Sequence, residues 1–96
     1  MKTRLELEVD LAKAEDEMRA ANLAFDMARK ALGRSKSPVR LGAYRAATAQ
    51  HDLCVRAVRL AVAALEAWHK AEAREAVKES RRAREALSGV QMRLDL

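Results

Sequence analysis

The apolar side chains between residues 11 and 32 recur with the period of an α-helix. They are spaced alternately by three and four residues, and the series is Leu11, Ala14, Met18, Ala21, Phe25, Ala28 and Leu32. This spacing forms the seam of a coiled coil or helical bundle. We therefore predict a helix over residues 11–32, with Asp10 as its N-cap and Gly33 as its stop.

Residues 33–38 form the clear break in this pattern and predict a turn. Ser37 is a suitable N-cap and Pro38 a suitable first helical residue, so a second helix should begin here. A short connection between two helices predicts an antiparallel hairpin. No proline follows Pro38, and the pattern favours one long helix over residues 39–88, with a break near residues 68–72 as the alternative.

Both ends of the chain alternate apolar and polar residues, which is the period of a half-buried strand. The alternation runs from Arg4 to Leu11 and, directly after Gly89, from Val90 to Leu96, and it predicts strands over residues 1–10 and 89–96. The favoured interpretation is a short β-ribbon made from the two termini. The alternative starts the first helix at Thr3, which forms a capping box with Glu6.

The second helix carries more apolar surface than a hairpin partner can cover. At 100° per residue the charged side chains in the middle of this helix fall in one stripe, comprising Arg45, Asp52, Arg56, Arg59, Glu66 and Lys70. Two apolar faces remain, one with Val55, Val58, Val62 and Leu65 and the other with Leu53, Ala57, Leu60 and Ala64. The first helix has a similar second set, namely Ala20, Leu23, Ala24, Met27 and Ala31.

A surface helix needs an apolar arc of only a little over about 100°. We therefore predict a mainly α, single-domain protein in which two antiparallel hairpins form a homodimeric bundle. A monomeric three-helix bundle, with the C-terminal segment folded back, is the alternative. The expected dimer or partner interface comprises Leu53, Val55, Val58, Leu60, Val62, Leu65 and Trp68.

The positive charge is concentrated around the predicted turn. The formal net charge is +5, and residues 33–59 contain six basic side chains and one acidic side chain. Arg40 lies at the start of a helix, where a cation opposes the dipole, and no acidic residue lies between Leu32 and His51. A basic hairpin tip of Arg34, Lys36, Arg40 and Arg45 is therefore a candidate site for an anionic partner.

The side chains that could support catalysis are few and dispersed. His51 and His69 would be about 27 Å apart on one continuous helix, and Cys54 is the single cysteine. The most plausible role for Cys54 is that of a small buried side chain among alanines, and no metal-ligand or phosphate-loop motif is present. We expect no catalytic residue, no metal and no cofactor.

The sequence gives only the class of function. We expect a cytoplasmic, non-enzymatic adaptor or inhibitor that forms a homodimer and binds another protein through its apolar face and basic tip. A dimer that binds nucleic acid through the tip is the alternative. Apolar runs are too short to span a bilayer and the N-terminus lacks a signal-peptide pattern, so we expect no membrane partner.

Overall fold

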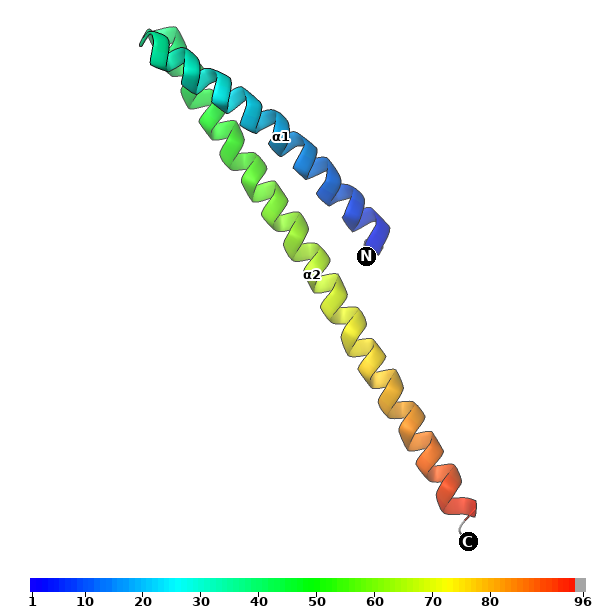
Figure 1. Ribbon diagram of the computed structural model, residues 1–96. Helices are drawn as coiled ribbons and strands as arrows, with labels where there is room; N and C mark the ends of the chain where they lie inside the picture. Colours follow the sequence, from blue (N-terminus) through cyan, green and yellow to red (C-terminus); the bar gives the residue numbers. More distant parts are fainter. Residues whose placement is uncertain (95–96) are drawn as a thin grey trace. The chain divides into compact units, whose positions relative to one another are not determined.

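The computed structural model contains two helices, α1 (Arg4–Arg34) and α2 (Pro38–Leu94) (Figure 1). It describes the backbone of residues 1–94 and the side chains of residues 1–88. No β-strand occurs within residues 1–94, so the prediction of a mainly α protein is confirmed.

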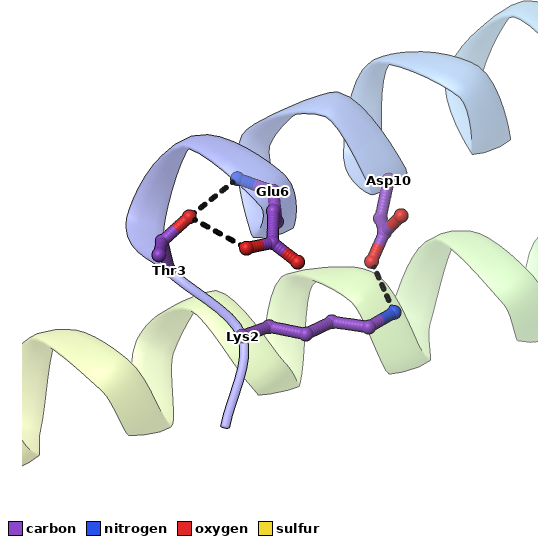
Figure 2. Close-up of polar contacts among 4 residues, drawn as sticks. All are labelled: Lys2, Thr3, Glu6 and Asp10. Atoms are coloured by element: carbon purple, nitrogen blue, oxygen red, sulfur yellow. Dashed lines mark hydrogen bonds and ion pairs between the residues drawn. The ribbon is translucent and has the colours of Figure 1, made fainter.

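The chain enters α1 through an N-cap at Thr3, and the predicted strand over residues 1–10 is wrong. The Thr3 hydroxyl oxygen accepts a hydrogen bond from the Glu6 backbone N–H at 3.2 Å and lies 3.2 Å from the Glu6 carboxylate (Figure 2). Lys2 bonds Asp10 at 2.7 Å and ties the first residues to the next turns. A helix satisfies its own backbone polar groups, whereas a terminal strand needs a partner strand.

The heptad positions of α1 face the hairpin interior, as the sequence predicts. Ala14 and Ala21 are buried, and the other five members of the series are half-buried. The N-terminal residues follow the same helical period, because Leu7 is half-buried while Leu5 and Val9 are exposed. The alternation in the sequence therefore reflects two sides of one helix.

Side-chain caps hold the turn between the helices. The Ser37 hydroxyl accepts a hydrogen bond from the Arg40 backbone N–H at 3.1 Å, which confirms Ser37 as the N-cap of α2. Gly33 was predicted to end the first helix, but it lies within the last turn of α1 and no described glycine has a positive φ. Ser35, in extended conformation, ends α1 instead, and its N–H bonds the Ala31 carbonyl.

The second helix continues further than the sequence pattern suggests. It is unbroken through residues 68–72, and it includes residues 89–94. The predicted strand over residues 89–96 is therefore wrong up to Leu94, and its last two residues lie outside the described part. Gly89 lowers helix propensity by roughly 1 kcal/mol relative to alanine, a cost that does not by itself end a helix.

The chain divides into two units, Met1–Leu65 and Glu66–Leu96. The first unit is an antiparallel hairpin of α1 and the N-terminal part of α2 (Figure 1). The ring of Phe25 lies 5.5 Å from Tyr44 and 5.5 Å from His51, and Arg40 contacts the Ala31 carbonyl at 3.1 Å. These contacts show that residues whose numbers add to roughly 72 lie at one level of the hairpin.

Candidate interaction surface

The hairpin covers one of the two predicted apolar faces of α2. Val55, Val58 and Leu65 are half-buried, and Cys54 beside them is 5% exposed. At 100° per residue these positions share the side of α2 that carries Tyr44 and His51. Val62 lies at the margin, with 37% of its surface exposed.

The other predicted face of α2 remains uncovered. Leu53 is 58% exposed and Leu60 is 71% exposed, although both belong to a helix whose opposite side is packed. A groove of about 310 Å³ lies between the helices, and its lining residues are Glu17, Ala20, Ala21, Ala24 and Gln50. At 100° per residue Gln50 lies about 60° from Leu53, so the groove and the exposed leucines are on the same side of the hairpin. We call the surface on this side the apolar face and define it by Ala20, Ala24, Ala46, Leu53, Ala57 and Leu60.

The opposite side of the hairpin is charged. On α1, Asp26 forms ion pairs with Arg29 at 3.1 Å and with Lys30 at 3.0 Å. These two cations, Lys30 first, hold the pKa of the Asp26 carboxyl below its ordinary value. Asp52 and Arg59 of α2 are exposed on the same side. The hairpin thus has one charged side and one side with exposed leucines and alanines.

The basic tip consists of residues with different surroundings. The Arg40 guanidinium donates a hydrogen bond to the Ala31 carbonyl at 3.1 Å, near the negative end of the α1 dipole. This internal contact accounts for a cation that the sequence left without a partner. Arg34, Lys36 and Arg45 are exposed, and none forms an ion pair with a described residue. Arg34 and Lys36 flank the turn, whereas Arg45 lies in the second turn of α2.

A hollow of about 450 Å³ lies beside the tip. Its lining residues are Leu32, Lys36, Ser37, Pro38 and Leu41. Two leucines and the proline ring make its walls apolar, and the Lys36 ammonium is the charged group among them.

The residues considered for chemistry have structural neighbours. Cys54 is buried, and the Gln50 amide nitrogen lies 3.7 Å from its sulfur. His51 packs on Phe25, while in the second unit Trp68 is half-buried and meets His69 edge-on at a ring distance of 5.3 Å. Within the described residues, no group of three His, Cys, Asp or Glu side chains could hold a metal ion. No helix in the described part of the chain is long and apolar enough to cross a membrane.

Comparisons with known proteins give no match. No protein-family model matches the chain, and no curated protein or solved structure is significantly similar to it.

Sequence reasoning identified the leucines of the apolar face but missed two features. The groove between Glu17 and Gln50 depends on which residues of α1 and α2 lie at one level, and one sequence does not contain that register. The Arg40 contact with Ala31 was missed for the same reason. A signal was nevertheless present, because an arginine soon after a short turn can reach the last carbonyls of the preceding helix.

Proposed function

We propose that the protein is a non-enzymatic interaction module whose first partner is a second copy of itself. The supporting observation is the contrast between the apolar face and the charged side of the same hairpin. Leu53 and Leu60 are mostly exposed, while the ion-paired Asp26 lies across the hairpin from them. Proteins rarely leave a continuous apolar surface of this kind in water unless a partner covers it.

The small core of the chain supports this proposal. Only Ala14, Ala21 and Cys54 are buried among the described side chains, so the chain has a small core of its own.

The hairpin is also large enough to form a stable interface. Residues 42–65 of α2 extend over about 35 Å, and two packed helices are roughly 18–20 Å wide. One side of the hairpin therefore offers roughly 650 Å², close to the ~800 Å² per partner that stable complexes bury. Covering the exposed parts of Leu53 and Leu60 would contribute about 1–2 kcal/mol for each side chain.

The basic tip gives such a dimer a second means of recognition. We propose that Arg34, Lys36 and Arg45 contact an acidic surface of a further protein, as an adaptor or inhibitor would. The tip hollow beside Lys36 would take an apolar side chain of that protein. The single cysteine favours a reducing cytoplasm as the place of action.

The oligomeric state tests the proposal directly. Light scattering on the purified chain should give twice the mass of one copy over the micromolar range. Leu60→Glu should shift the mass toward one copy, because it places a charge in the centre of the apolar face. Leu23→Glu is the matched control: Leu23 is 63% exposed and lies about 160° around α1 from Phe25, away from that face. A wild-type chain that remains a single copy up to millimolar concentration would contradict the proposal.

Nucleic acid is the second candidate partner, and the lack of acidic residues from Leu32 to His51 favours it. Fluorescence anisotropy with a short DNA duplex should distinguish the two candidates. A phosphate contact loses affinity log-linearly with salt concentration, and Arg34→Glu with Lys36→Glu should abolish it. Salt-independent or undetectable binding would leave the protein-binding proposal as the explanation of the tip.

A further inference from the structure

One face of α2 carries a pattern of leucines and small residues that is symmetric about a point between Arg56 and Ala57. Leu53 and Leu60 lie on either side of this point, followed outward by small residues at Ala49 and Ala64. The same order continues outward, and the small residues of this series in α2 are Gly42, Ala46, Ala49, Ala64, Ala67 and Ala71. The two residues of each pair, such as Leu53 with Leu60 and Ala49 with Ala64, lie at equal distances along the sequence from this point. A helix with this order presents the same pattern when it is turned end to end.

A pair of opposite charges on α1 has its own centre of symmetry. Glu17 lines the groove of the apolar face, and Lys13 lies one turn earlier on the same side of the helix. Both side chains are exposed, and neither forms an ion pair with any residue that the structure describes. Their midpoint is Glu15.

The two centres lie at one level of the hairpin. Contacts between α1 and α2 place residue 15 beside residues near 57, since numbers that add to roughly 72 are level. The centre of the leucine pattern is therefore level with the centre of the charge pair. One two-fold axis across the hairpin at this level would make both patterns self-complementary.

We propose that two copies pack through their apolar faces about this axis, with α1 antiparallel to α1 and α2 antiparallel to α2. This inference rests on the proposed self-association and specifies its geometry. In a two-fold interface each contact occurs twice. Leu53 packs against Leu60 of the second copy, and Lys13 forms an ion pair with Glu17 of the second copy. Ala57 meets its own counterpart beside the axis.

The charges favour this arrangement over the other face-to-face dimer. If α1 lay against α2 of the second copy, Lys13 would face Leu60 and Glu17 would face Ala57. Both charges would then lose water beside apolar side chains, with only each other in the same helix as partners, which is costly. In the proposed arrangement each charge gains an opposite charge, and the alanines of both helices allow close approach of the axes.

Charge exchange between copies is the first test. K13E alone and E17K alone each place like charges across the interface, so each should weaken the homodimer by roughly tenfold. An equimolar mixture of the two variants should form heterodimers with the affinity of the wild type, because every contact then joins opposite charges. The double variant K13E/E17K should also recover the homodimer. Each single variant has two like charges at positions 13 and 17 of its own helix, and mixing the variants does not change this. Any recovery of affinity in the mixture therefore has to come from contacts between the two copies.

Cysteine cross-linking in a Cys54→Ala background is the second test. A57C should form a disulfide with its own counterpart, and L53C should cross-link with L60C in a mixture. L53C should not cross-link with itself, because the two positions are about 10 Å apart along the axes and a disulfide requires Cα atoms within about 7 Å. A dimer in which L53C cross-links with itself and the charge exchange recovers nothing would overturn this geometry. A wild-type chain without any dimer would overturn the self-association itself.

Discussion

Phe25 of α1 packs against Tyr44 and His51 of α2, and its replacement tests the hairpin. A fully buried Phe→Ala change costs about 3–5 kcal/mol. Phe25 is half-buried, so we take roughly half of that range. Its ring pairs with Tyr44 and His51, each at 5.5 Å, add about 0.5–1.5 kcal/mol, while alanine returns up to about 0.5 kcal/mol of helix propensity. The expected loss for Phe25→Ala is therefore about 1.5–3.5 kcal/mol.

Urea unfolding followed by far-UV circular dichroism measures this loss at a fixed protein concentration. Leu23→Ala is the matched control, because Leu23 lies two residues away on the exposed side of α1. The control should change the free energy of unfolding by less than about 0.5 kcal/mol. Phe25→Leu should lie between the two, since it keeps bulk and loses the ring pairs. Equal unfolding midpoints for Phe25→Ala and Leu23→Ala would refute the packing of Phe25 between the helices.

Three further changes test other parts of the hairpin. Thr3→Ala removes the N-cap hydrogen bond to the Glu6 backbone N–H and should lower the free energy of unfolding by about 1 kcal/mol, and a Thr3→Ser control should retain most of it. Ala21→Leu forces a larger side chain between packed helices and should cost about 1–3 kcal/mol; an unchanged midpoint would mean that the helices do not pack at Ala21. Lys30 lowers the pKa of the Asp26 carboxyl, so their ion pair stabilises the folded state at pH values above the ordinary carboxyl pKa. This stabilisation is lost as the pH falls through the lowered pKa of Asp26. Thermal midpoints of wild type and Asp26→Asn should therefore differ at neutral pH and converge in acid.

The packed face of α1 could be predicted because the spacing of its apolar residues by three and four along the sequence is enough to define it. Every position from Leu11 to Leu32 in the series is buried or half-buried. The N-terminus was misjudged because Leu5, Leu7, Val9 and Leu11 fit two periods at once. Leu7 and Leu11 belong to the helical seam, whereas Leu5 and Val9 stay exposed. The capping box was visible in the sequence, and it was the better guide because it satisfies backbone groups that a lone strand leaves open.

The candidate surface could be predicted only in part, because it depends on the register between two helices. The sequence shows that α2 has two apolar faces, and it does not show which one α1 covers. The contacts of Phe25 with Tyr44 and His51 decide that question and leave Leu53 and Leu60 exposed. They also bring Lys13 and Glu17 to the level of the α2 centre. The pattern of a single helix does not show which residues of the other helix lie at its level.

The composition of the core gives a physical reason to expect folding and association together. Buried alanines such as Ala14 and Ala21 let the helices approach closely, but each buried carbon contributes only about 0.8 kcal/mol. Ordering each residue costs about 1–2 kcal/mol of backbone entropy, which a core of small side chains offsets poorly. The leucines that could supply more burial face outward on the apolar face. A second copy would bury them, so the midpoint of unfolding should rise with protein concentration, as it does when a partner binds only the folded state.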